Sequence, residues 1–311
     1  MRAARNLAFV TCAATLALIA VGVYVRATGS GLGCPDWPTC HGGIVPPGDR
    51  HAIIEFSHRF VAALVGLLVV STAVFAWRFF RQAPVVLWAA LITVPLVGLQ
   101  GGLGALTVER ELPPEIVATH LLLAMLILTF LATVALGMQI EVQGGPRPGQ
   151  REAGLRIAQR ATATIALFGV VVWVGGYMGE SGASTACEGW PACNGGILPG
   201  NDDQQITHMA HRYLAAALVV PLGAAVAAAW QARAALPWAA AAAAALTAIY
   251  AAQVTVGAFN VWYTFPDALT VSHTVLASAL WLTLSGVGVI GFYQPARERG
   301  RGPLSAVEVP A

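Results

Sequence analysis

Glu55-Phe56-Ser57-His58-Arg59 is the stretch that decides the fold, because its pattern returns 153 residues later as His208-Met209-Ala210-His211-Arg212. The same shift pairs further residues without a gap: Cys34 with Cys187, Trp37 with Trp190, Pro38 with Pro191, Cys40 with Cys193, Gln100 with Gln253, Gly104 with Gly257, and His120 with His273. A match that stays in register over this distance predicts an internal duplication.

The composition is that of a membrane protein. Of the 311 residues, 57% are hydrophobic and 10% are charged, whereas a soluble domain carries about 25% charged residues. The 17 basic residues, all arginine, nearly balance 15 acidic ones, and the net charge of +2 gives no reason to expect a nucleic-acid partner.

Eight stretches are long and apolar enough to cross a bilayer, which takes about 20 residues. They lie near 7–27, 54–79, 85–107, 114–138, 159–179, 206–230, 236–260 and 267–292. We therefore predict an all-α integral membrane protein with eight transmembrane helices. Each copy holds four of them, an even number, so both copies enter the membrane in the same direction. The expected architecture is two four-helix bundles related by a pseudo-twofold axis along the membrane normal.

The arginines predict the orientation. Twelve of them lie at the termini and in the even-numbered connections, which marks those segments as cytoplasmic: Arg2, Arg5, Arg78, Arg81, Arg147, Arg151, Arg156, Arg160, Arg233, Arg297, Arg299 and Arg301. The odd-numbered connections hold most of the acidic residues and are expected outside. This places the chain in the cell membrane with both termini in the cytoplasm.

The predicted organisation has four parts. An N-terminal bundle covers 1–140, and a linker rich in Gly, Pro, Gln and Arg covers 141–158. A C-terminal bundle covers 159–292, and an unstructured tail covers 293–311.

Four of the five cysteines form two matched arrangements, Cys34 with Cys40 and Cys187 with Cys193, in loops assigned to the outside. An oxidising compartment, an even count and equal spacing favour a disulfide in each loop. A metal site and a reversible dithiol are the alternatives. The fifth, Cys12, lies in the first span and is expected to pack there.

The duplication sorts the seven histidines. His58 and His120 are matched by His211 and His273, while His41, His51 and His208 have no histidine counterpart. Ionisable side chains inside membrane spans mark ligands or pathways. Two imidazoles at similar depth across a four-helix bundle suit the axial ligation of a haem. Hydrogen-bonded interhelical histidines and a zinc site are the alternatives, although zinc takes three or four ligands.

The copies differ beside the histidines. Glu55 precedes His58 by three residues and shares its helical face, whereas His208 stands at that place in the second copy. We therefore predict proton transfer by Glu55 in the first bundle and electron transfer in the second; a helix-start acid at the interface is the alternative. Arg59 and Arg212 are expected to meet haem propionates, or to snorkel to the interface.

Taken together, the Gly31-Leu32-Gly33-Cys34-Pro35-Asp36-Trp37-Pro38-Thr39-Cys40 segment, the Glu55 to Arg59 segment and the second set through His273 resemble haem A synthases. The resemblance covers nearly the whole chain. It implies oxidation of the C8 methyl group of haem O to a formyl group, with the N-terminal bundle as substrate site. It also implies a haem b held by His211 and His273, and a haem O-producing farnesyltransferase as a partner.

Two other functional classes stay open at this point. A di-haem cytochrome b-type carrier would take electrons from a quinol without altering its haems, and it needs neither Glu55 nor an exchangeable haem. A transporter or haem exporter would use the duplicated bundles for alternating access, but it gives no reason for paired ligands. The sequence does not identify the electron acceptor, for which a quinone is one candidate, or the source of the formyl oxygen.

Overall fold

The computed structural model describes residues 1–144 and 151–298, and this part of the chain is helical without β-strands. The α-helices are α1 (Arg2–Ala27), α2 (Arg50–Phe79), α3 (Pro84–Glu109), α4 (Pro114–Val142), α5 (Arg151–Glu180), α6 (Asp203–Ala217), α7 (Val219–Gln231), α8 (Ala239–Trp262) and α9 (Asp267–Glu298). A 3-10 turn, η1 (Ala183–Thr185), follows α5.

Eight helical segments in the described ranges are long and apolar enough to cross a membrane, which confirms the predicted all-α membrane class. The sixth segment is divided into α6 and α7 at Leu218. Pro221 explains the break, because its ring cannot coexist with an undisturbed helical carbonyl four residues earlier, at Ala217. The matching position in the first copy is Leu68, and α2 is continuous there.

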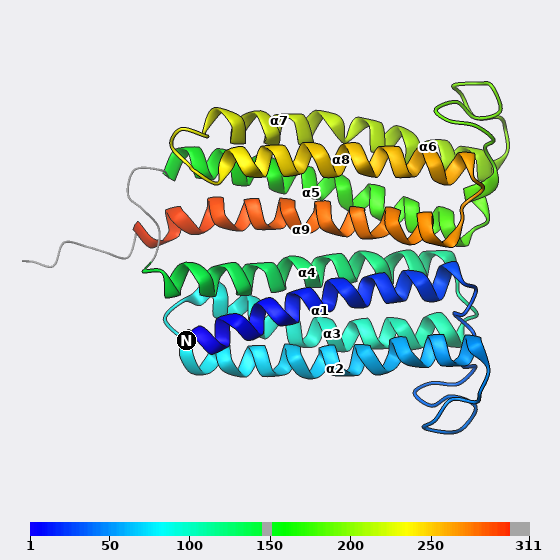
Figure 1. The fold of residues 1–311 in the computed structure, drawn as a ribbon, viewed down its shortest axis with the longest axis horizontal. Coiled ribbons are helices and arrows are strands. Elements are labelled where there is room, and N and C mark those ends of the chain that lie inside the picture. The colour runs from blue at the N-terminus through cyan, green and yellow to red at the C-terminus, as the bar shows by residue number, and fades with distance from the viewer. Residues whose placement is uncertain (145–150, 299–311) are drawn as a thin grey trace, which may run out of the picture.

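The helices form two groups of four spans, drawn one above the other in Figure 1. In the first group α1 and α3 each pack against both α2 and α4, so α2 and α4 occupy diagonal corners. In the second group α5 and α8 pack against both the α6–α7 segment and α9, which are diagonal in the same way. The histidine-bearing helices therefore face each other across each group.

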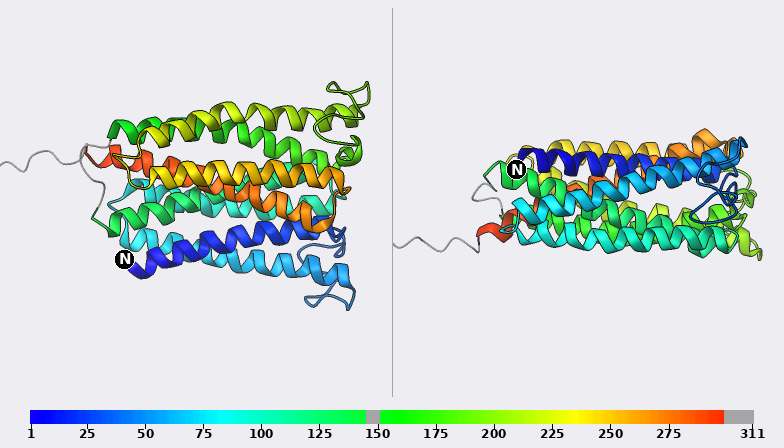
Figure 2. Two further views of the ribbon diagram at one scale, coloured as in Figure 1. Left: turned by 45° about the horizontal axis from the view of Figure 1, so that its top comes forward. Right: turned by 90° about the horizontal axis from the view of Figure 1, so that it is seen from below.

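The groups meet where α4 packs against α5 and α9, and where α1 packs against α9; α4 and α9 lie side by side in both Figures 1 and 2. Trp281 donates its indole N–H to the Thr129 hydroxyl (2.8 Å), which also contacts the Ser285 hydroxyl (2.9 Å). Nearer the loop end, Arg26 of α1 forms an ion pair with Glu180 of α5. The contact between the groups thus combines an apolar core with a few buried polar links.

Both ends of the described chain lie at one end of the molecule, and the long loops 28–49 and 181–202 lie at the other (Figure 1). Two helices extend into segments that the sequence analysis left outside the bundles. Helix α5 begins at Arg151, inside the predicted linker, and α9 continues to Glu298, inside the predicted tail. Residues 145–150 and 299–311 of these two segments lie outside the described residues.

Several backbone features recur 153 residues apart. Helix α2 is capped by Asp49, whose carboxylate accepts from the Ala52 N–H (3.0 Å), and α6 is capped in the same way by Asp202. Positive φ angles also recur in matched pairs: His41 with Asn194, Glu111 with Thr264, and Leu112 with Phe265. These recurrences support the duplication, while the pseudo-twofold axis stays a prediction.

The structure contains both predicted disulfides. Cys34 is joined to Cys40 and Cys187 to Cys193, with Cα–Cα distances of 4.7 and 4.6 Å. Cys12 is free and buried, as expected. The described residues contain no cluster of three or more His, Cys, Asp or Glu side chains that could hold a metal ion, so neither metal alternative gains support.

Candidate haem sites and the loop clasp

The four paired histidines lie at matching depths. His58 follows the first residue of α2 by eight positions, and His211 follows the first residue of α6 by eight. His120 and His273 each follow the first residue of their helices by six. At 1.5 Å per residue these offsets correspond to about 12 and about 9 Å from the helix start, so each pair is nearly level near the loop end.

The two histidines of each group lie on diagonally placed helices. His58 on α2 and His120 on α4 form the first pair, and His211 on α6 and His273 on α9 form the second. The predicted pairs thus lie at matching depth on diagonal helices, and their role as ligands stays a prediction.

A glycine on a neighbouring helix supports each imidazole. A Cβ atom at Gly22, Gly104, Gly175 or Gly257 would lie 3.0, 3.4, 2.7 or 3.0 Å from Cε1 of His58, His120, His211 or His273, respectively. These glycines are again related in pairs by the shift of 153 residues. Their missing side chains let the ring edges rest against the helices, which limits how each imidazole can turn.

All four imidazoles have a buried Nδ1 atom without a hydrogen-bond partner among the described residues. Burying such a group unpaired costs free energy, so four repeated instances point to an occupant that engages the rings. Two level imidazoles on opposite sides of an apolar bundle fit a planar iron porphyrin ligated from both faces. Nearby, Gln100 donates to the His120 carbonyl (3.0 Å), and Gln253 lies 3.2 Å from Nε2 of His273.

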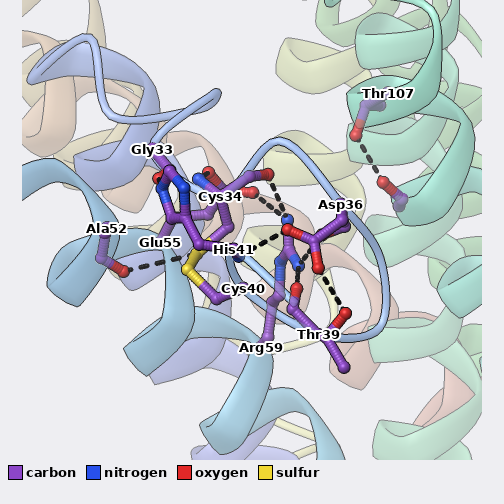
Figure 3. A network of polar contacts seen from close by, with 11 residues as sticks. Gly33, Cys34, Asp36, Thr39, Cys40, His41, Ala52, Glu55, Arg59 and Thr107 are labelled. Atoms are coloured by element: carbon purple, nitrogen blue, oxygen red, sulfur yellow. Dashed lines mark hydrogen bonds and ion pairs between the residues drawn. A yellow bond between two sulfur atoms is a disulfide. The ribbon is translucent and has the colours of Figure 1, made fainter. Parts of the chain in front are cut away.

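Glu55 and Arg59 hold the first disulfide loop in place through hydrogen bonds, an arrangement of these two residues and the loop that we call the clasp (Figure 3). Glu55 is buried, with one carboxylate oxygen 2.5 Å from Nη2 of Arg59 and the other accepting from the Cys34 N–H (2.8 Å). Arg59 also donates to the carbonyls of Cys34 (2.9 Å), Asp36 (2.6 Å) and Thr39 (2.7 Å). The hydrogen bonds of Glu55 thus run to the loop and to Arg59, and none runs to His58.

The second copy builds the same clasp with different chemistry. Arg212 donates to the carbonyls of Pro191 (3.1 Å) and Ala192 (2.9 Å), and its other nitrogen donates to Nε2 of His208 (2.9 Å). The opposite ring nitrogen of His208 donates to the Ala183 carbonyl (2.9 Å). An imidazole therefore holds the arginine where the first copy uses a carboxylate.

Sequence reasoning missed two features of these sites. It did not assign the four supporting glycines, although Gly104 and Gly257 were part of the matched pattern. It also did not foresee that Arg59 and Arg212 direct their terminal nitrogens toward loop carbonyls. Both features could have been found from the constant shift of 153 residues between the copies. That shift pairs Gly22 with Gly175 and Thr39 with Ala192.

Asp36 organises the first loop. Its carboxylate accepts from the Thr39 hydroxyl, the His41 N–H (2.5 Å) and the Gly42 N–H (2.9 Å). These hydrogen bonds, that from Thr39 foremost, lower the pKa of Asp36 from 3.8 to about 2. The second copy has Gly189 at this place, and there the Asn194 side chain accepts from the Glu188 N–H (2.8 Å) instead.

We expect Asp36→Asn to loosen the first loop and leave the second unchanged. The pKa of Asp36 is lower in the folded protein than in the unfolded chain. The ionised carboxylate therefore stabilises the loop fully above about pH 3.9, and this stabilisation is lost as the pH falls through about 2. Hydrogen exchange of residues 36–43 at neutral pH measures the effect, and residues 189–196 are the internal control. Equal exchange in variant and parent would contradict it.

Gly175→Ala is expected to displace the His211 imidazole. The new methyl group would lie 2.7 Å from Cε1 and 3.1 Å from Nδ1 of His211, whereas Gly179, one turn later on α5, has open space around it. Misplacing a ligand commonly costs about 10- to 100-fold in metal affinity, so haem content after purification should fall. Gly179→Ala is the matched control and should retain haem. Full haem retention in Gly175→Ala would refute the predicted role of this contact.

Comparison with known proteins places these sites in context. The model of the COX15-CtaA family, described as cytochrome oxidase assembly protein, matches residues 5–53 and 49–285. The heme A synthase of Symbiobacterium thermophilum is 38% identical over 92% of this chain and 94% of its own length. Those of Alkalihalophilus pseudofirmus (32%; 68% and 71%) and Geobacillus kaustophilus (28%; 90% and 90%) are also similar.

Proposed function

Because the chain belongs to the COX15-CtaA family of cytochrome oxidase assembly proteins, we propose that it is a membrane oxidoreductase that converts haem O to haem A. In this proposal the C8 methyl group of haem O becomes a formyl group through successive hydroxylations and loss of water. Residues 1–140 form the substrate bundle, and residues 159–292 form the bundle that holds haem b. The similar proteins named heme A synthase support the overall activity.

The observation that carries this proposal is the pair of level, buried imidazoles in each bundle, each with an Nδ1 that has no hydrogen-bond partner among the described residues. His58 and His120 would hold the iron of haem O in the first bundle. The surrounding helices are apolar, which keeps bulk water from the reacting carbon. Glu55 is the candidate proton acceptor, because it is the buried carboxylate closest in sequence to these ligands.

His211 and His273 would hold haem b in the second bundle. When bound, that haem supplies a one-electron acceptor beside the substrate bundle. The protein contributes its position, through the glycines that fix both imidazoles. Arg212 keeps a buried Nε–H without a partner among the described residues, which supports the predicted contact with a propionate; for Arg59 that contact remains a prediction from the sequence.

The proposed setting is the cell membrane, with both termini in the cytoplasm and the disulfide loops outside. The termini and loops lie at opposite ends of the molecule, as this arrangement requires (Figure 1). A haem O synthase as supplier of substrate and a quinone as final electron acceptor complete the proposal.

Co-expression with a haem O supply, followed by chromatography of the extracted haems, tests the function. We expect haem A to appear with the parent protein and not with an empty vector. Recovery of unmodified haem b alone, from protein containing two haems and supplied with haem O, would favour the di-haem carrier instead.

A further inference from the structure

The tips of the two disulfide loops carry matched pairs of exposed aliphatic side chains. Ile44 and Val45 are 82% and 75% exposed, and Ile197 and Leu198, at the corresponding positions, are 77% and 75% exposed. No Asp, Glu or Arg occurs in residues 41–48 or 194–200. Single exposed aliphatic residues are common on protein surfaces, but two adjacent pairs at the same place in both halves require an explanation.

The loops present these side chains in a fixed conformation. Cys40 and Gly43 exchange two backbone hydrogen bonds (2.9 and 3.1 Å), and Cys193 and Gly196 do the same (2.8 and 2.9 Å). The apolar pair follows directly after each of these tight turns, whose cysteines are buried and disulfide-bonded. Little conformational entropy is therefore lost if the tips bind something.

Both loops fold back along the helices that follow them. Tyr213 donates its hydroxyl to the Ile197 carbonyl, and Tyr213 lies ten residues into α6, about 15 Å from the helix start. Figure 1 shows the loops extending sideways from opposite edges of the molecule, with their tips turned back beside the helices. The tips thus lie alongside the spans and not beyond their ends.

This level corresponds to the border of the lipid hydrocarbon. Helix α2 has 30 residues and is about 45 Å long, whereas the hydrocarbon core is about 30 Å thick. A centred helix extends about 7 Å beyond the core at each end. The contact with Tyr213, about 15 Å from the helix start, therefore holds the tip of the second loop at or below that border. Phe60 and Tyr213, at matching positions on α2 and α6, are 57% and 45% exposed there.

We propose that Ile44–Val45 and Ile197–Leu198 insert into the lipid leaflet at the loop end and act as two interfacial anchors. Lipid surrounds the whole molecule and reaches both edges at once, whereas one partner protein would have to span opposite sides of it. The apolar, charge-free tips match the boundary between headgroups and acyl chains, where interfacial anchors bury their apolar side chains. The tips therefore hold the loops, and through them the arginine clasps, at a fixed depth.

Photo-cross-linking of the full chain tests the proposal. Benzoylphenylalanine replaces Val45 or Leu198 in protein reconstituted in phosphatidylcholine nanodiscs, with Glu188, an exposed charged residue of the second loop, as the control position. We expect a mass increase of one phospholipid at both tips and none at Glu188.

Irradiation of native membranes distinguishes the other occupants. A cross-link from either tip to a second copy of the chain or to another protein, without lipid adducts, would overturn the proposal, and so would the absence of any adduct in folded protein. If one variant does not fold, the other loop carries the same test, since both tips are exposed to the same degree.

Discussion

His211→Ala should purify without the haem of the second bundle, and His58→Ala should keep that haem but lose conversion of haem O. Each substitution removes one of the two proposed axial ligands of its bundle and leaves only His273 or His120 to hold the haem. Loss of a residue that supports a metal ligand lowers metal affinity by up to about 100-fold. Loss of the ligand itself should weaken haem binding by at least as much. Absorbance of the purified protein and chromatography of extracted haems measure the two effects.

The chain offers a matched control for these changes. His51 is the second residue of α2, at the loop end of the molecule, and the Ser30 hydroxyl is its hydrogen-bond partner (2.9 Å). The second copy has Gln204 at the corresponding position. His51→Gln should retain both the haem and the conversion. If His58→Ala and His211→Ala behaved like His51→Gln, the four histidines would be interhelical hydrogen-bonding residues and the haem assignment would fail.

Glu55→His is expected to stop turnover while the first loop keeps its structure. The second copy shows that histidine at this place holds the clasping arginine, since His208 accepts from Arg212 at 2.9 Å. The variant therefore preserves the clasp but removes the carboxylate. Loss of a positioned acid or base commonly lowers rates by about 10²- to 10⁴-fold. Rates of haem A formation, with haem content measured in parallel, give the result.

Arg59→Gln separates the two roles of Glu55. It removes the bonds from the guanidinium to the loop carbonyls but leaves the Glu55 carboxylate and its bond with the Cys34 N–H. If Glu55 only anchors the loop, Glu55→His should stay active because it keeps the clasp, and Arg59→Gln should be inactive because it breaks the clasp. A catalytic carboxylate predicts the opposite order of the two activities.

The sequence predicted the spans well, and it placed the paired histidines at matching depths, because both results depend on local counting. A run of about 20 apolar residues is sufficient to identify a membrane helix, and the distance of His58 from Asp49 fixes its depth once the helix is assigned. The helix ends were less predictable, since polar turns such as that beginning at Arg151 continue a helix beyond the apolar run. Pro221 indicates the helix break at Leu218. The sequence analysis did not predict the break, because the apolar run continues through both residues.

Other features depend on which helices pack together, and a single sequence does not state that. The contact of Gly175 with His211 joins α5 to α6, and its geometry exists only after the bundle forms. The same holds for Arg59, whose long side chain reaches either a propionate or a loop carbonyl from the same helical position. Knowledge of the loop path was needed to see which acceptors lie within its reach.

The contact between α4 and α9, which we call the seam, prevents one half of the chain from replacing the other. Trp281 on α9 bonds to Thr129 on α4, but the residue of the first half that corresponds to Trp281 is Leu128, and the residue of the second half that corresponds to Thr129 is Leu282. Two N-terminal halves would bring leucine to threonine at this seam, and two C-terminal halves would bring tryptophan to leucine. Neither pairing can remake the bond, so a half produced on its own has a built-in preference for its complement over a second copy of itself.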